Sequence, residues 1–257
     1  MRKILVLLAA MAAFFAVSAG PASAVLYGQP DGTDHPYVGV VRFFDADGNY
    51  LWRCTGTLIS PTVVLTAGHC TFGTASAEFW VSETAPSTAE VLSGDYKHGV
   101  TGSTYAYPGY DDFATFPNTG DVGIVVLDKP IRLSTYGSLP TAGLVDTLYK
   151  HELFTIVGYG LQDVRPIEVQ KVQRLQATVK LISLQSGYSA GFNLQLSSNN
   201  GQPHQGGLCF GDSGGPVLYG TTILAVNSFV INGNCAGSGY SYRIDQPEIL
   251  AWIKSFL

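Results

Sequence analysis

Short runs of β-branched and aromatic residues recur along most of the chain, with turn-forming residues between them. Examples occupy residues 37–44, 62–65, 123–127 and 221–226. Asp45–Asn49 combines Asp, Gly and Asn directly after the first of these runs and is a turn signal. Short strands separated by such turns are typical of an all-β sandwich or barrel, and not of strands that alternate with helices. The pattern therefore predicts an all-β fold.

The clearest helix signal lies at the C-terminal end of the chain. Asp245 can cap a helix, Pro247 suits an early helical position, and Glu248 lies three residues after the Asp, as in a capping box. Apolar residues then fall on one face of this helix: Ile249, Trp252, Ile253 and Phe256. We expect a helix over about residues 246–256.

The first residues have the character of a secretory signal peptide. Met1, Arg2 and Lys3 precede a mostly apolar run over residues 4–17, and Ala22–Ala24 is a small-residue cleavage pattern. The apolar run is shorter than the roughly 18 residues that a membrane-spanning helix needs. We expect cleavage after residue 24, which leaves a mature, secreted domain over residues 25–257 with no membrane attachment.

The chain is acidic, with 14 Lys and Arg against 19 Asp and Glu and a formal net charge of -5 at pH 7. Cleavage would also remove Arg2 and Lys3, so the mature chain is more acidic still. Binding of DNA or RNA needs a basic face that neutralises phosphates. The composition therefore excludes nucleic acid as a partner.

The four cysteines, an even number in an exported chain, predict two disulfides. They are Cys54, Cys70, Cys209 and Cys235, and four cysteines allow three pairings. Zinc binding is the alternative, but the sequence contains no Cys-x-x-Cys pair. His151 and Glu152 begin like a metalloprotease motif, which lacks its second His four residues later. We expect no metal and no organic cofactor.

A serine hydroxyl at Ser213 lies among residues with almost no side chains, in Gly211–Pro216. Glycines let the backbone turn tightly and leave N–H groups free to face one point, as an anionic intermediate of acyl transfer requires. A serine also needs a base beside it, and the segment 66–70 offers His69. Asp121, at the start of an apolar run, can orient that base by accepting its Nδ1–H. These residues predict nucleophilic catalysis.

The order of these residues along the chain distinguishes between classes of serine hydrolase. The α/β-hydrolases place their histidine after the serine, and the last histidine here is His204. A subtilisin-like order needs an Asp before His69, where all candidates are loop-like: Asp31, Asp34, Asp45 and Asp47. The order His69, Asp121, Ser213 fits only the chymotrypsin arrangement. Rivals for these roles lack a comparable setting: Asp111 and Asp112 lead into no strand, and we interpret His35, His98, His151 and His204 as surface or loop residues.

These segments resemble the chymotrypsin/trypsin-like family of secreted serine endopeptidases. Its Ala-Gly-His-Cys box, its Asp before an apolar strand and its Gly-Asp-Ser-Gly-Gly-Pro motif all occur here in the same order. The resemblance implies two packed antiparallel β-barrels, over about residues 25–132 and 133–245, with the active site between them and a C-terminal helix after them. It also implies two disulfides, Cys54–Cys70 and Cys209–Cys235.

The resemblance further implies how the site is supported. The backbone N–H groups of Gly211 and Ser213 would form the oxyanion hole. Asp212 would pair with the α-amino group of the mature chain, which here belongs to Val25, although some bacterial relatives do without this ion pair. Because Ala24 and not Arg or Lys precedes the cut, we expect signal peptidase to release this amine with no separate zymogen step.

The same alignment outlines the main specificity pocket. Gly207, six residues before the nucleophile, occupies its base and is followed by Leu208. Trypsin-like members carry an Asp at the base, and its absence argues against selection of Arg or Lys. The far wall and the outline come from Ser228, Phe229, Val230 and Gly239. A neutral pocket narrowed by Leu208 and Val230 favours small or medium apolar side chains.

We therefore expect a secreted serine endopeptidase that hydrolyses peptide bonds through an acyl-enzyme. Its partners would be protein or peptide substrates, and we expect it to act as a monomer. Two alternatives stay open. One is a non-catalytic homologue that acts as a binding protein, although such proteins usually lose a triad member. The other is an esterase on the same scaffold, because esters yield to the same groups.

Overall fold

The first half of the chain forms a closed, six-stranded antiparallel barrel. The computed structural model describes residues 25–164, 171–198 and 206–257, so the predicted signal peptide lies outside the described residues. The barrel has the order β2-β3-β4-β7-β6-β5. Its strands are β2 (Val38–Phe44), β3 (Tyr50–Leu58), β4 (Val63–Thr66), β5 (Ser76–Trp80), β6 (Val100–Ala106) and β7 (Gly123–Leu127). Strands β2, β4 and β7 match the apolar runs that the sequence pattern predicts in this half, whereas β5 and β6 correspond to none of those runs.

The predicted turn between β2 and β3 is confirmed. The Asp45 carboxylate accepts hydrogen bonds from the backbone N–H groups of Asp47 and Asn49, at 3.0 and 2.8 Å. Gly48 adopts a φ of +81°, which an L side chain would disfavour. The side chain of the first turn residue thus closes the hairpin.

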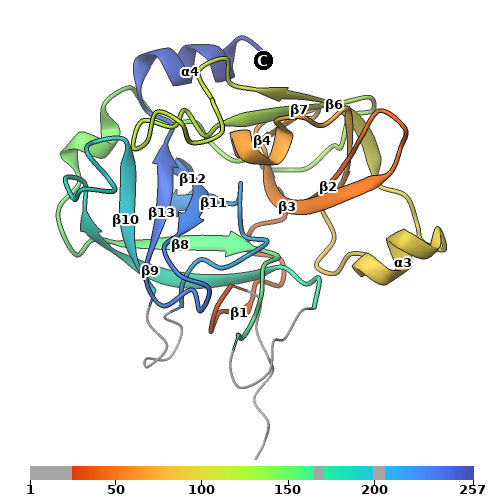
Figure 1. The fold of residues 1–257 in the computed structure, drawn as a ribbon, viewed down its shortest axis with the longest axis horizontal. Helices are drawn as coiled ribbons and strands as arrows, with labels where there is room; N and C mark the ends of the chain where they lie inside the picture. Colours follow the sequence, from red (N-terminus) through yellow and green to blue (C-terminus); the bar gives the residue numbers. More distant parts are fainter. Residues whose placement is uncertain (1–24, 165–170, 199–205) are drawn as a thin grey trace, which may run out of the picture.

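The second half forms another barrel beside the first (Figure 1). The sheet order is β1-β9-β10-β13-β12-β11-β8, and pairing of β8 with β9 closes six of the strands into a ring. The strands are β1 (Gln29–Pro30), β8 (Leu153–Gly158), β9 (Leu175–Ser183), β10 (Asn193–Ser198), β11 (Pro216–Tyr219), β12 (Thr222–Val230) and β13 (Gly237–Arg243). Side chains along β9 alternate between buried and half-buried, as one covered face of a sheet requires. The all-β expectation with two antiparallel barrels is therefore confirmed.

The segment before the first barrel contacts the second one. Gln29 and Pro30, which form β1, pair with Gln176 and Leu175 of β9. The sequence-based boundaries assign this segment to the first half, over about residues 25–132. The strands of the first barrel itself begin at Val38.

Four short helices complete the described chain: α2 (Gly68–Thr71), α3 (Thr88–Ser93), the 3₁₀ helix η1 (Leu144–Thr147) and α4 (Pro247–Lys254). Helix α4 is the predicted C-terminal helix, and Ile249 and Ile253 are buried beneath it. The Trp252 ring meets Tyr107 with 5.4 Å between centroids. The end of the chain therefore packs on the first barrel. None of the helices in the described ranges is long and apolar enough to cross a membrane.

The predicted cap of α4 is wrong. The N-cap residue is Gln246, which makes no side-chain cap, and Pro247 opens the helix. Asp245 is fully buried, and its carboxylate accepts from Arg243 Nε at 2.6 Å and from the Val145 N–H at 2.8 Å. A buried guanidinium is the stronger partner for this carboxylate, so Asp245 joins α4 to the loop that carries η1.

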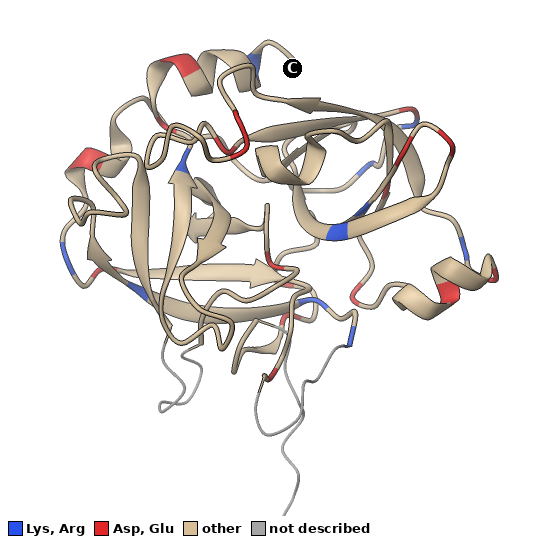
Figure 2. Cartoon of the chain, viewed as in Figure 1, with Lys and Arg blue, Asp and Glu red and all other residues tan. Residues whose placement is uncertain are grey.

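Charged residues are spread over the chain in the view of Figure 2, with Lys and Arg dispersed among Asp and Glu. Arg243 is one of the few basic side chains that are buried, and it bonds both the buried Asp245 and the exposed Asp146. These two acids differ in exposure, with side chains that are 0% and 65% exposed. They therefore offer a matched comparison of a buried and an exposed ion pair.

We predict that Asp245→Ala lowers the free energy of unfolding by about 3–5 kcal/mol, because it leaves the Arg243 charge buried without its main partner. The matched change Asp146→Ala is expected to cost less than about 1 kcal/mol, since water screens an exposed pair. Urea unfolding at neutral pH measures both values. Equal losses in the two variants would contradict this account of the α4 junction.

Candidate active site

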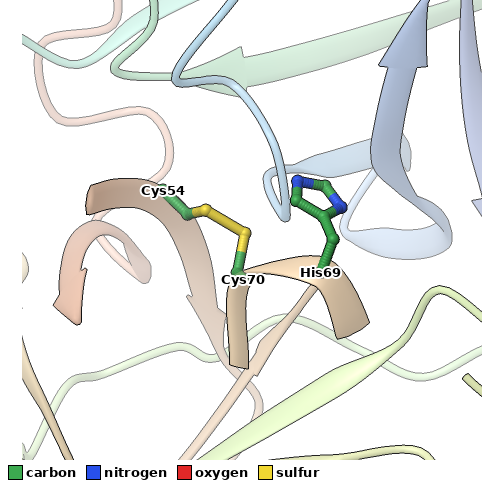
Figure 3. A group of neighbouring side chains, drawn as sticks. All are labelled: Cys54, His69 and Cys70. Atoms are coloured by element: carbon green, nitrogen blue, oxygen red, sulfur yellow. A yellow bond between two sulfur atoms is a disulfide. The ribbon is translucent and has the colours of Figure 1, made fainter. Parts of the chain in front are cut away.

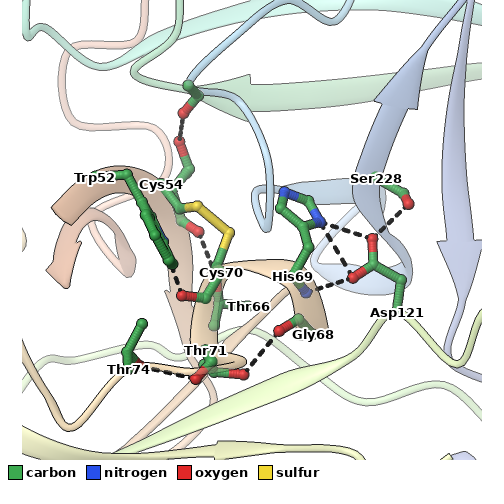
Figure 4. The surroundings of a disulfide bond; sticks show 12 residues. Trp52, Cys54, Thr66, Gly68, His69, Cys70, Thr71, Thr74, Asp121 and Ser228 are labelled. Atoms are coloured by element: carbon green, nitrogen blue, oxygen red, sulfur yellow. Dashed lines mark hydrogen bonds and ion pairs between the residues drawn. A yellow bond between two sulfur atoms is a disulfide. The ribbon is translucent and has the colours of Figure 1, made fainter. Parts of the chain in front are cut away.

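Paired strands bring His69 and Asp121 together. His69 lies in α2, directly after β4, and Asp121 precedes β7, which pairs with β4. His69 Nδ1 is 2.9 Å from Asp121 Oδ2 and 3.1 Å from Oδ1, and the backbone N–H of His69 donates to Oδ1 at 2.8 Å (Figure 4). Ser228, from β12 of the second barrel, donates its hydroxyl to Oδ2. Asp121 is therefore held by groups from both barrels.

The buried carboxylate sets the protonation of this pair. Burial alone would raise the pKa of Asp121, but the facing His69 and the hydrogen bonds outweigh it and lower that pKa. Burial likewise acts to lower the pKa of His69, and Asp121 overrides it, so the pKa of His69 is raised. Since Nδ1 faces the carboxylate, Nε2 is the ring nitrogen left for proton transfer. Asp112 acts on His69 only through its charge, while Asp121 makes the contact.

Ser213 lies in the loop before β11 and lines the same pocket as His69. Its carbonyl accepts the N–H of Thr55, from β3, at 2.8 Å. Gly214 follows with a φ of +77°, and a Cβ there would lie 2.0 Å from Thr66 Oγ1. A glycine is therefore required after the serine, because the loop runs directly against β3 and β4.

The backbone before Ser213 carries the two N–H groups that the resemblance assigns to an oxyanion hole. Gly211 has a φ of +97°, and its carbonyl accepts the Thr55 hydroxyl at 2.9 Å. Within the described part of the chain, neither the Gly211 nor the Ser213 N–H donates a hydrogen bond. Both donors are thus available to a ligand.

The structure forms the two disulfides that the resemblance implies, Cys54–Cys70 and Cys209–Cys235. Cys70 follows His69 directly, and its carbonyl accepts the Trp52 indole N–H at 2.9 Å (Figure 4). Cys54, Cys70 and His69 also lie close enough to resemble a metal site (Figure 3). The two sulfurs are bonded to each other and offer no thiolate, and His69 Nδ1 faces Asp121, so this group does not fit a metal.

Asp212 points away from solvent and is fully buried. Its carboxylate accepts the Gly160 N–H at 2.8 Å and the Cys209 N–H at 3.0 Å. A Cβ at Gly158 or Gly160 would lie 2.1 or 2.5 Å from this side chain, so both glycines make room for it. Burial raises the pKa of Asp212 to about 7, although the two N–H donors and the charge of Arg53 act to lower it.

The first residues of the predicted mature chain pack against the second barrel. Val25 is fully buried, in the same apolar cluster as Leu208. Leu26 exchanges two backbone hydrogen bonds with Gly207, each of 3.0 Å. The Val25 nitrogen is a peptide nitrogen in the uncleaved chain, so its ion pair with Asp212 stays a prediction for the cleaved form.

A pocket of about 270 Å³ opens between His69 and Ser213. Four of the predicted specificity residues line it: Leu208, Ser228, Phe229 and Val230. Gly207 and Gly239 are not among the described residues that line it. Gly207 pairs with Leu26, and a Cβ on Gly239 would lie 2.7 Å from the Leu208 side chain.

Phe113 and Phe210 also line the pocket, and the sequence analysis missed both. The Phe113 ring lies 6.0 Å from the His69 ring and 6.2 Å from Phe229. Phe229 in turn stacks on Tyr240 at 4.8 Å. Phe210 lies between Cys209 and Gly211, so its nearness to the serine segment could have been inferred from the sequence. Nothing in the sequence indicates that Phe113 lies at this pocket. Three phenylalanines, Phe113, Phe210 and Phe229, therefore contribute to the lining of this pocket.

Known proteins share this architecture. HL collagenase is 18% identical, with a TM-score of 0.71 over 90% of this chain and 98% of that one. The scabies mite inactivated protease paralogue S-D1 is 15% identical, with a TM-score of 0.69 over 90% of this chain and 97% of that one. These likenesses show the fold.

Sequence comparison gives the family. Brachyurin from Leptuca pugilator is 26% identical over 212 residues, which cover 80% of this chain and 88% of brachyurin. The family model described as Trypsin matches residues 29–253, nearly all of the described chain. The chain therefore belongs to the trypsin family.

Proposed function

We propose that this chain is a secreted serine endopeptidase that hydrolyses peptide bonds through an acyl-enzyme. The observation that carries the proposal is the 2.9 Å contact between His69 Nδ1 and Asp121 Oδ2, at the edge of a pocket that Ser213 also lines. A buried carboxylate that fixes the histidine tautomer beside a serine is the arrangement that acyl transfer needs. Substrates would be proteins or peptides, bound by a monomer.

In the proposed reaction, Ser213 Oγ attacks the carbonyl carbon of the scissile bond while His69 Nε2 takes its proton. Asp121 keeps the other proton on Nδ1 and stabilises the imidazolium that forms. The N–H groups of Gly211 and Ser213 donate to the oxyanion. His69 then protonates the leaving amine, and a water attacks the acyl-enzyme by the same steps in reverse.

The rival function is binding without catalysis. Solved structures with this fold include inactivated protease paralogues of the scabies mite. In favour of catalysis, this chain keeps a serine, a histidine and an aspartate in the required order, and Asp121 is fully buried yet bonded to His69 and Ser228. A peptidase and an esterase would use the same groups, and cleavage of peptide substrates distinguishes them.

We predict that a peptidyl phosphonate labels Ser213, and that Asp121→Asn lowers kcat about 10⁴-fold, because the histidine then adopts the wrong tautomer. Mass spectrometry locates the label, and peptide hydrolysis gives kcat. The Ser213→Ala variant, which lacks the attacking oxygen, is the control for labelling. An unlabelled Ser213, or turnover in Asp121→Asn that matches the unaltered protein, would favour the binding function.

We further infer that the pocket prefers small or medium apolar side chains. Leu208 is one of its apolar lining residues, and besides His69 the ionisable residue in the described lining is Asp212, whose carboxylate already accepts the N–H groups of Gly160 and Cys209. Val230, Phe113 and Phe210 add further apolar side chains to the lining. An apolar wall gains from burying apolar side chains and leaves Arg or Lys without a partner.

We predict that Val230→Gly raises kcat/KM for a substrate with Phe in the pocket, relative to one with Ala, by about 10-fold or more. The larger side chain gains the space that the valine occupies. Peptide pairs that differ only at this position measure the ratio. Ile231→Gly, the same backbone change one residue outside the pocket lining, is the control, and an equal shift in both variants would contradict the role of Val230.

The freed α-amino group of Val25 is proposed to pair with Asp212. Val25 and Leu26 are already held in the second barrel, next to the pocket wall. Before cleavage, no positive group among the described residues contacts the buried carboxylate, which is consistent with its pKa of about 7. A nearby ammonium would lower that pKa and hold the residue before Ser213 in one orientation.

This proposal predicts a pH-dependent difference between the mature chain and one extended by two residues before Val25. A carboxyl whose folded pKa is raised gives stability that is fully present below the unfolded pKa of about 4 and is lost as pH rises through about 7. The extended form should therefore lose roughly 4 kcal/mol more than the mature form across this window. It should also be less active.

Unfolding free energies between pH 4 and 8 measure the effect. In an Asp212→Asn background, the extension should no longer change the pH dependence, which provides the control. Full activity and unchanged pH dependence in the extended form would show that the Val25 amine does not pair with Asp212.

A further inference from the structure

We propose that Arg53 is a positioning residue of the proposed active site, which supports the Gly211 loop and places a positive charge opposite Asp212 through one shared peptide group. This inference rests on the proposed function, because it concerns the same oxyanion hole. Arg53 belongs to β3, directly before Cys54 of the disulfide beside His69. No motif in the sequence marks it.

The shared peptide group joins Tyr159 to Gly160. Its carbonyl oxygen, on Tyr159, accepts a hydrogen bond from Arg53 Nη1. Its N–H, on Gly160, donates to Asp212 Oδ1 at 2.8 Å. The cation therefore lies at the negative end of the peptide dipole and the anion at its positive end. Both charges polarise this dipole in the same sense, so each hydrogen bond strengthens the other.

Arg53 also lies against the oxyanion loop itself. A Cβ on Gly211 would lie 3.6 Å from Arg53 Cζ and 3.0 Å from the Cα of Gly160. The guanidinium and the Tyr159–Gly160 peptide thus pack against the backbone whose N–H is the proposed oxyanion donor. On the far side, the Gly211 carbonyl is held by the Thr55 hydroxyl. Arg53 and Thr55, two residues apart on β3, fix this backbone from the first barrel.

The electrostatic surroundings favour this role. Among the described side chains, Arg53 is the cation whose charge acts to lower the pKa of Asp212, against the larger effect of burial. Burial lowers the pKa of Arg53 itself, while Tyr50 and Asp212 act to raise it and Arg42 opposes them. In the cleaved chain the proposed Val25 amine would be a second cation facing Asp212. Arg53 is present in both forms, so it favours the ionised carboxylate before and after cleavage.

The test compares three variants of the mature protein. Arg53→Met removes both charge and donor, Arg53→Gln keeps a donor for the Tyr159 carbonyl without charge, and Arg53→Lys keeps the charge. Arg132→Met, at an exposed arginine in a loop of the described chain, is the matched control. The first readout is the titration midpoint of the Asp212 carboxyl, followed by ¹³C NMR and assigned by its loss in Asp212→Asn. The second is kcat and KM for peptide hydrolysis.

We expect the Asp212 midpoint to rise in Arg53→Met and Arg53→Gln, and to stay near its original value in Arg53→Lys and Arg132→Met. We expect kcat to fall about 10-fold or more in Arg53→Met, with KM changed less than about threefold, because the oxyanion donor acts mainly in the transition state. Arg53→Lys should recover part of kcat. If Arg53→Met does not fold, the Asp212 midpoint and kcat of the Arg53→Gln and Arg53→Lys variants test the proposal instead.

An unchanged Asp212 midpoint in folded Arg53→Met or Arg53→Gln would overturn the proposal, as would an unchanged kcat. Failure of the proposed function has a different signature. In that case the unaltered protein has no peptidase activity and Ser213 stays unlabelled, whereas the NMR titration still reports whether Arg53 acts on Asp212.

Discussion

The site depends on the contact of a single residue of β3 with the serine loop. The Thr55 N–H bonds the Ser213 carbonyl and the Thr55 hydroxyl bonds the Gly211 carbonyl, at 2.8 and 2.9 Å. Its neighbour Cys54 is bonded covalently to Cys70, which follows His69. His69 and Ser213, the proposed base and nucleophile, come from different barrels, and this path joins them through few rotatable bonds. Backbone contacts and a disulfide lose little conformational entropy on ordering, so they can hold such a geometry closely.

Two buried aspartates use the same low-dielectric interior in opposite ways. Asp121 has a titratable partner and two further donors, and its pKa is lowered. The donors that contact Asp212 within the described ranges are backbone N–H groups, Arg53 lies farther off, and the pKa of Asp212 is raised. The difference lies in the partners, because both side chains are fully buried. One carboxylate is thereby fixed as an anion, while the other responds to whichever cation approaches it.

Motif residues and strands could be predicted from the sequence because their signals are local. The Gly-rich serine segment and the apolar run that forms β7 carry their signals in consecutive residues. Asp245 was misjudged because a neighbouring Arg243 and the distant Val145 N–H outcompete the helix end for its carboxylate. Phe113 and Arg53 act through contacts with segments far away in sequence. Neither periodicity nor spacing encodes such long-range contacts, so these two residues could be identified only from the three-dimensional structure.

The pairing of the chain's beginning has a consequence for the order of folding. Leu26 bonds Gly207, and β1 bonds β9, so the first mature residues find their partners in the last-made half of the protein. These contacts close long loops and form late, after the second barrel has assembled. While the chain is being synthesised from its amino end, Leu26 and β1 thus have no partner until Gly207 and β9 have been made. The contacts of Leu26 and β1 are therefore expected to form after the strands of the second barrel have paired.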